Sequence, residues 1–180
     1  MSAVPPPEWS HIVAVDAVGR TGTMHLIADA DARTLLARRL GLDALDRFEV
    51  HAALTATAEG ILLDGRIDAD VEQSCAATTL PVATRINDAF RLRFVAHLGD
   101  GVGDIADEEG IELGADDCDL VEIEDQRIDV AEAAVQSLAL ALPPFPRHPD
   151  ADRILREKGV KAEGEAGPFA ALAALKNLPT

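Results

Sequence analysis

The sequence predicts an α+β domain: an antiparallel β-sheet, open or curled into an incomplete barrel, with two packed α-helices and a flexible C-terminal arm. Apolar and polar residues alternate over 48–58 and again over 63–72, as in strands with one buried face. Apolar residues recur at spacings of four over 129–142, which indicates a helix. With 180 residues, 48% of them hydrophobic, the chain has enough apolar side chains to form a core.

The N-terminal third predicts two strands and a short helix. Residues 11–18 and 23–28 have the pattern of a strand pair that turns at Gly19–Gly22. Asp29 or Asp31 is placed to cap a helix, and Gly41 is placed to end it.

The middle of the chain predicts a β-hairpin and a further strand. The two alternating segments are separated by Glu59-Gly60, a connection short enough for an antiparallel hairpin. Residues 86–97 alternate as well, with Asp88 as an exception on the apolar side. We expect one face of this sheet to be exposed to solvent.

The C-terminal part predicts the second helix and then a polar arm. Asp129 with Glu132 three residues later is typical of a capped helix start, and Pro143-Pro144 ends the helix. This helix is expected to cover one face of the sheet. The expected boundaries are a flexible leader at 1–7, a single α+β domain at 8–148 with an acidic loop at 100–119, a linker at 149–167 and a short amphipathic segment at 168–180.

The negative charge of the chain is concentrated in one segment. The formal net charge is −16, and residues 100–125 hold 12 of the 32 acidic residues and no lysine or arginine. Such a segment repels phosphate and attracts basic proteins, so we expect no DNA partner and only weak or indirect RNA contact. The acidic loop offers these residues to a basic partner: Asp100, Asp104, Asp107, Glu108, Glu109, Glu112, Asp116, Asp117 and Asp119.

Candidate chemical motifs are incomplete. Cys75-Ala-Ala-Thr78 has half the spacing of a zinc or redox motif, but threonine stands where a second cysteine is needed, and we expect Cys75 to be buried after the second hairpin strand. The aspartates lack the spacing of a calcium loop, the histidines are scattered along the chain, and no serine lies in a nucleophile elbow. We therefore expect no catalytic residues, no cofactor and no metal site.

Two further patterns bear on location and on RNA. No run of about 18 apolar residues occurs, and the N-terminus lacks the pattern of a secretory signal, so we expect a cytoplasmic protein with no membrane partner. Arg91 and Arg93 share a predicted strand face, and residues 147–161 are locally basic. These arginines and lysines leave direct RNA binding open as an alternative.

Three motifs resemble those of the YceD family, the large ribosomal RNA subunit accumulation proteins. Cys75-Ala-Ala-Thr78-Thr-Leu-Pro81-Val82 is similar to the family's Cys-x-x-Cys/Thr-x-x-Pro motif. Ile128-Asp129-Val-Ala-Glu132, followed by Pro143-Pro-Phe-Pro146, resembles its second signature, and Pro168-Phe169-Ala-Ala-Leu172-Ala-Ala-Leu175-Lys176 resembles its C-terminal one. Pro7-Glu8-Trp9-Ser10 adds a match near the start. Thr78 departs from the Cys-x-x-Cys of many relatives and argues against a metal or disulfide there.

The resemblance implies a role in the synthesis, processing or stability of large-subunit (23S) ribosomal RNA, and it brings no catalytic residues. Together with the charge, it favours a non-catalytic ribosome biogenesis factor whose partner is a basic ribosomal protein or a large-subunit assembly intermediate. Direct RNA binding is the first alternative, and an enzyme or binding module for a small basic ligand is the second.

Overall fold

The computed structural model describes residues 7–96 and 119–160. The chain divides into two compact units, residues 1–72 with 83–142 and residues 73–82 with 143–180. The predictions for positions 1–6, for positions 100–118 of the acidic loop and for the segment 168–180 lie outside the described residues. Among the helices that the structure describes, none is long and apolar enough to cross a membrane.

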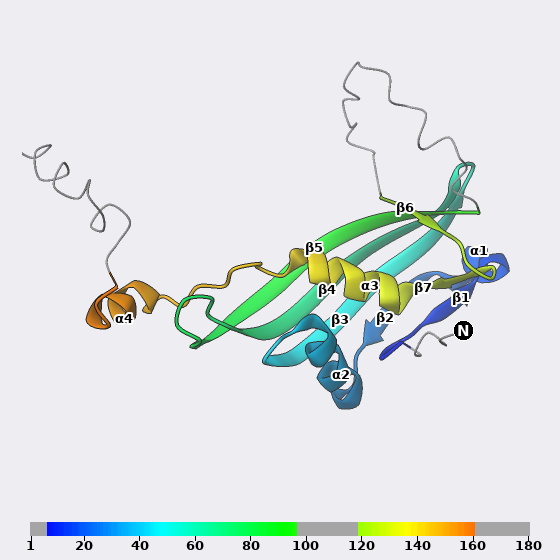
Figure 1. The fold of residues 1–180 in the computed structure, drawn as a ribbon. Helices are drawn as coiled ribbons and strands as arrows, with labels where there is room; N and C mark the ends of the chain where they lie inside the picture. The colour runs from blue at the N-terminus through cyan, green and yellow to red at the C-terminus, as the bar shows by residue number, and fades with distance from the viewer. Residues whose placement is uncertain (1–6, 97–118, 161–180) are drawn as a thin grey trace, which may run out of the picture. The chain divides into compact units, whose positions relative to one another are not determined.

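The larger unit is built on a five-stranded sheet (Figure 1). Its order is β2 (Thr23–Ile27), β3 (Ala44–Thr57), β4 (Gly60–Ser74), β5 (Pro81–Val95) and β6 (Asp119–Glu122). The predicted hairpin is confirmed, because β3 and β4 pair antiparallel from Thr57↔Gly60 to Ala44↔Glu72. The described strands form an open sheet, not a closed barrel, with β2 and β6 at its edges.

The alternating pattern of the hairpin sets which side chains are buried. Phe48, Val50 and Leu54 of β3 are buried, as are Leu63 and Ile67 of β4, while the immediate neighbours of these residues are more exposed. At Gly65 of β4, a Cβ atom would lie 2.2 Å from the Phe90 ring of β5, so this ring covers the glycine. The close approach of Phe90 explains why the alternation includes a glycine at this position.

Two predictions about the sheet were wrong. The β5–β6 pair is parallel, with Leu92↔Asp119 and Val95↔Glu122, so the sheet is mixed and Asp119 belongs to a strand instead of a loop. Residues 11–18 and 23–28 do not pair with each other. β1 (Ile12–Ala14) pairs with β7 (Arg127–Asp129), while β2 pairs with β3.

The segment between β1 and β2 is helical. A 3-10 turn, η1 (Val15–Ala17), leads into the single turn of α1 (Val18–Thr21). Gly22 follows with a φ of 62° before β2 begins. This helical connection separates the two strands that the sequence pattern places together.

The two predicted helices are confirmed with their caps. In α2 (Ala30–Leu40), the Asp29 side chain accepts from the Ala32 N–H at 2.8 Å, and Gly41 ends the helix with a φ of 67°. α3 (Val130–Ala141) begins after Asp129 and ends before Pro143. A further helix, α4 (Ala151–Glu157), lies in the smaller unit, within the range predicted as a linker.

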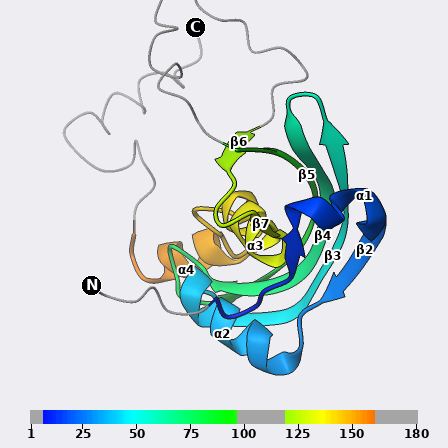
Figure 2. The ribbon, with the colours of Figure 1, turned by 90° about the vertical axis from the view of Figure 1, so that its right-hand side faces the viewer.

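The core of the larger unit is mainly aliphatic and lies between the sheet and α3. Val130, Ala134 and Leu138 of α3 are completely or almost completely buried and belong to the same cluster as the inward residues of β3 and β4. Figure 2 shows the sheet curved, with α3 on its concave side. Trp9 packs on the buried Phe48 with ring centroids 5.2 Å apart. The predicted covering of one sheet face by α3 is therefore confirmed.

Candidate functional site

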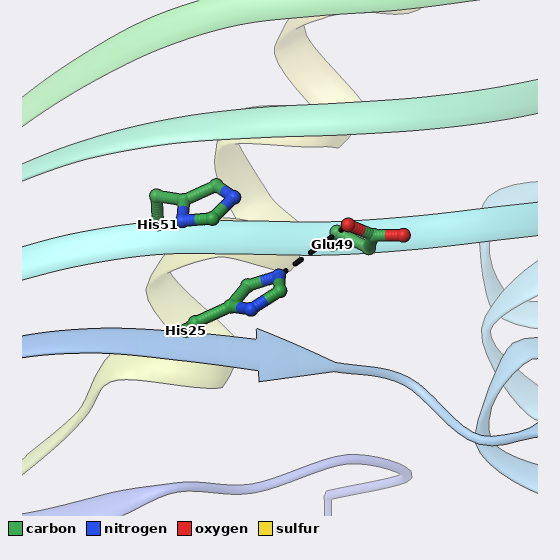
Figure 3. Close-up of side chains that lie close together, drawn as sticks. All are labelled: His25, Glu49 and His51. Atoms are coloured by element: carbon green, nitrogen blue, oxygen red, sulfur yellow. Dashed lines mark hydrogen bonds and ion pairs between the residues drawn. The ribbon is translucent and has the colours of Figure 1, made fainter.

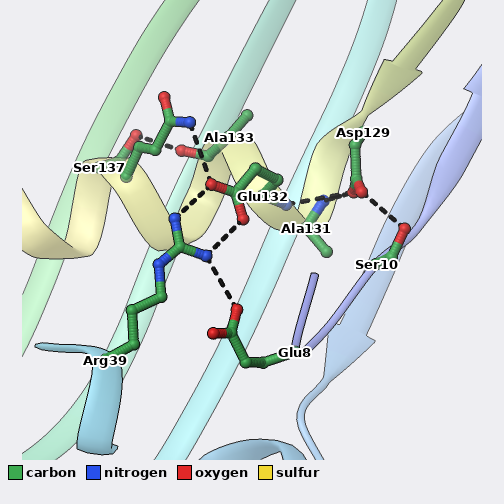
Figure 4. Close-up of polar contacts among 9 residues, drawn as sticks. Glu8, Ser10, Arg39, Asp129, Ala131, Glu132, Ala133 and Ser137 are labelled. Carbon is green, nitrogen blue, oxygen red and sulfur yellow. Dashed lines mark hydrogen bonds and ion pairs between the residues drawn. The ribbon is translucent and has the colours of Figure 1, made fainter. Parts of the chain in front are cut away.

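Asp129 joins the start of α3 to the N-terminal segment of the chain. Its Oδ1 accepts the main-chain N–H groups of Ala131 and Glu132, both at 3.1 Å, and of His11 at 2.9 Å. Its Oδ2 accepts the Ser10 hydroxyl at 2.6 Å (Figure 4). A carboxylate is suited to this position because it accepts several bonds and faces the positive end of the helix.

Glu132 ties α3 to α2 through Arg39. The Arg39 guanidinium donates two bonds to the Glu132 carboxylate, at 2.8 and 2.5 Å, and one to Glu8 at 3.0 Å. Gln136 donates to Glu132 as well, at 3.1 Å. Arg39 lowers the pKa of Glu132 and Glu132 raises the pKa of Arg39, because each stabilises the charged form of the other.

A cavity of about 370 Å³ opens beside this network. Its lining combines apolar residues that are buried or half-buried, Leu92, Phe94 and Ile128, here called the floor, with five carboxylates and one arginine, here called the wall. The carboxylates belong to Glu122, Glu124, Asp125, Asp129 and Glu132, and the arginine is Arg127. Acids over an apolar floor suit a basic side chain, whose aliphatic stem packs on the floor while its charge meets the wall.

The rim of the cavity contains a tight turn in a rare conformation. Asp125 and Gln126 have φ values of 50° and 57°, and Glu124 bridges to Arg127 across them. Two successive positive φ values are typical of a type I′ turn, which glycine or asparagine adopts more readily than glutamine does. The turn holds the carboxylates of Glu124 and Asp125 on the wall of the cavity.

A family comparison assigns the chain. The model of the YceD family, described as large ribosomal RNA subunit accumulation protein, matches residues 63–176, more than half of the sequence. The chain belongs to the YceD family. The family name points to a role in the accumulation of large-subunit ribosomal RNA. No curated protein and no solved structure matches the chain.

The first YceD motif forms a compact turn in the smaller unit. Its main chain closes from the Cys75 N–H to the Leu80 carbonyl at 2.7 Å, and Cys75 is buried as predicted. The Ala76 N–H donates to the Pro146 carbonyl at 2.9 Å, and the His148 N–H donates to the Cys75 Sγ at 3.3 Å. The motif positions Cys75 and Pro146 thus meet although they are far apart in the sequence.

The environment of Cys75 favours its ionised form. The main-chain N–H of His148 and the Thr78 side chain lower the pKa of the thiol to about 7.

Pro81, the last residue of this motif, begins β5. Pro143 accepts a hydrogen bond on its carbonyl from Gln73 at 3.3 Å, which ties the second signature to the end of β4.

Other predicted site residues fall into two groups. Asp119 is exposed in β6 and does not line the acidic cavity. The remaining acidic-loop residues and the three apolar residues of the C-terminal motif lie outside the described residues: Asp100, Asp104, Asp107, Glu108, Glu109, Glu112, Asp116, Asp117, Phe169, Leu172 and Leu175.

Four of the arginines on which direct RNA binding depends already have acidic partners. Arg91 lies 2.6 Å from Asp64, and Arg93 pairs with Glu59. In the smaller unit, Arg147 pairs with Asp152, and Arg153 pairs with Asp150 and Glu157. A phosphate would have to displace these carboxylates, which lowers the gain from binding it.

One cluster of side chains depends on strand register and was not predicted from the sequence. The histidines are scattered along the chain, but the antiparallel pairing of β2 with β3 places His25 opposite His51. Glu49 lies on the same strand face, two residues before His51. No local signal announces this cluster, because its members come together only once the two strands are aligned.

Proposed function

We propose that the chain supports the accumulation of large-subunit ribosomal RNA as a non-catalytic assembly factor that holds a basic segment of a large-subunit ribosomal protein. The observation that carries this proposal is the cavity with five carboxylates above an apolar floor. Three of these carboxylates, Glu122, Glu124 and Asp125, belong to the acidic segment 100–125 and are exposed. Asp129 and Glu132 also line the cavity, and both are engaged in hydrogen bonds of the α3 network.

In this proposal the chain acts on ribosomal RNA indirectly, through the charge of its protein partner. Ribosomal proteins carry basic segments that bind RNA, and an acidic surface covers such a segment until RNA competes for it. RNA itself is repelled by the same carboxylates. In this mechanism the chain protects ribosomal RNA by delivering a soluble, shielded protein partner.

The test is a binding measurement with a charge-neutral variant. The variant combines Glu122→Gln, Glu124→Gln and Asp125→Asn, where asparagine tolerates the positive φ of 50° at position 125. We expect affinity for the basic partner among purified large-subunit proteins to fall about fivefold at low salt, since three rim charges at about 0.3 kcal/mol each sum to about 1 kcal/mol. The difference between variant and wild type should shrink at high salt.

A matched control removes the same charge elsewhere on the larger unit. Asp16, Asp31 and Asp46 are exposed and do not line the cavity, and their conversion to asparagine should leave the affinity within about twofold of the wild type. Equal affinity for the wild type and the cavity variant would refute the proposal. A gel shift of large-subunit RNA fragments by the chain alone would favour direct RNA binding instead.

A second candidate function uses the same cavity for a small basic ligand. The volume of about 370 Å³ lies at the small end of the range for ligand pockets, and several polar groups converge in it. Spermidine is a suitable probe because it combines amines with aliphatic stems. If spermidine displaces the protein partner at a concentration well below the salt concentration that does so, this alternative is supported.

A further inference from the structure

The paired strands β2 and β3 present two histidines and a glutamate on one face. His25 and His51 are directly opposite in the antiparallel register, and Glu49 is two residues before His51. Figure 3 shows the two imidazole rings side by side, and the Glu49 carboxylate lies next to the His25 ring. The three side chains therefore come together from two neighbouring strands of one sheet.

The distances are those of a nearly assembled metal site. The rings are stacked with centroids 4.1 Å apart, and the His25 Nε2 lies 3.3 Å from the Glu49 Oε2. One ligand atom from each residue lies within 4.8 Å of the other two. Ligand atoms about 2.0–2.1 Å from a tetrahedral Zn²⁺ are separated by roughly 3.3 Å, so one edge of the tetrahedron is present. The two ring planes are nearly parallel, 9° apart, so the His51 ring must rotate before its nitrogen and that of His25 can bind the same ion.

The surroundings leave these side chains both accessible and oriented. The His25 side chain is 45% exposed, so an ion can reach it from solvent. Arg47 donates to the Glu49 Oε1 at 2.8 Å and leaves Oε2 turned toward His25. The same bond lowers the pKa of Glu49 to about 2, so this carboxylate is ionised at neutral pH. A partner on the far oxygen is typical of a carboxylate that ligates a metal.

We propose that His25, Glu49 and His51 bind a divalent transition-metal ion of the Zn²⁺ class on the exposed face of the β2–β3 pair. Two imidazoles and one carboxylate select such ions over Mg²⁺ and Ca²⁺, which prefer oxygen ligands alone. Three protein ligands leave one position for water or for a donor from a bound partner. This inference is independent of the proposed ribosomal role, since the cavity shares no residue with the cluster.

The test measures Zn²⁺ affinity of the full-length chain, free of any polyhistidine tag, by competition with a chromophoric chelator. His25→Gln, His51→Gln and Glu49→Gln should each weaken Zn²⁺ binding at least about tenfold. Mutating even a residue that only hydrogen-bonds to a metal ligand typically lowers metal affinity by that factor. His11→Gln is the matched control, because His11 is not part of the cluster, and it should bind as the wild type does. Zn²⁺ should raise the melting temperature of the wild type and of this control only.

Cobalt provides a readout that needs no substitution. Co²⁺ bound to imidazole and carboxylate gives a visible spectrum without thiolate charge-transfer absorption, and its unpaired electrons should broaden the NMR signals of the His25 and His51 rings first. A thiolate band would instead assign the metal to a cysteine and overturn the proposal. Equal Zn²⁺ affinity in the wild type and the three cluster variants, or no binding by the wild type, would overturn it as well.

Discussion

At the scale of single residues, the spacing of Asp129 and Glu132 in the second motif has a structural explanation in this chain. Asp129 and Glu132, three residues apart, bind different neighbours: Asp129 holds the N-terminal segment, and Glu132 holds α2 through Arg39. The sequence predicted the cap at Asp129. It did not predict the Arg39 pair, because that contact joins residues 93 positions apart.

Replacing Asp129 by alanine should lower the free energy of unfolding by about 2 kcal/mol, since the helix loses its cap and Ser10 and His11 lose an acceptor. Urea unfolding followed by circular dichroism measures this change. Asp31→Ala removes an acid from the first turn of α2 where Asp29 is the cap, and it should cost less than about 0.5 kcal/mol. Equal effects of the two substitutions would contradict the role of Asp129.

The Arg39–Glu132 pair should make stability depend on acid pH. Because its folded pKa is lowered, Glu132 adds stability that is complete above its ordinary pKa of 4.5 and is lost as pH falls through the folded value. Glu132→Gln should therefore reduce the loss of stability below pH 4.5, by about 1 kcal/mol. Denaturant unfolding between pH 7 and 3 measures it. Arg39→Gln should produce the same reduction. If the free energy of unfolding of both variants depends on pH as it does in the wild type, the Arg39–Glu132 pair does not cause this pH dependence.

At the scale of elements, local signals predicted the helices and the β3–β4 hairpin. Caps, prolines and alternation act within a few residues, so the bounds of α2 and α3 and the buried face of β3 followed from the sequence. The short strands β6 and β7 did not follow, and β1 was expected within residues 11–18 but with the wrong partner strand. Strands of three or four residues carry little periodicity, and their partners are set by contacts distant in sequence.

Helix α3 provides a test with its own internal control. Leu138 is completely buried against the sheet, and its replacement by alanine should cost about 2 to 5 kcal/mol. Leu140, two residues away, is 84% exposed, and Leu140→Ala should cost less than about 0.5 kcal/mol. Thermal and urea unfolding give both values. Similar costs at the two positions would place α3 in a different orientation.

The same scale explains why the histidine cluster was missed. His25 and His51 lie in strands separated by the whole of α2, and a shift of β2 by one residue would send His25 to the other face. The sequence contains the ligands, but only the register brings them together.

At the scale of the whole molecule, charge distribution matters more than net charge. The formal charge of −16 suggested a protein that avoids RNA, and its uneven spread pointed to an acidic segment that attracts basic partners. The structure adds that the described end of this segment lines a cavity with an apolar floor. These two features are what the proposed binding of a basic peptide depends on: an electrostatic attraction and an apolar surface for its side-chain stems.

The accumulation of large-subunit ribosomal RNA in cells is the most direct test of the account. The chromosomal copy would be replaced by the Glu122→Gln, Glu124→Gln, Asp125→Asn variant or by the Asp16, Asp31, Asp46 control, and the ratio of large- to small-subunit RNA measured at equal protein levels. We predict that the cavity variant lowers the ratio toward that of a deletion strain and that the control does not. A normal ratio in the cavity variant, beside a lowered ratio in the deletion strain, would contradict the account.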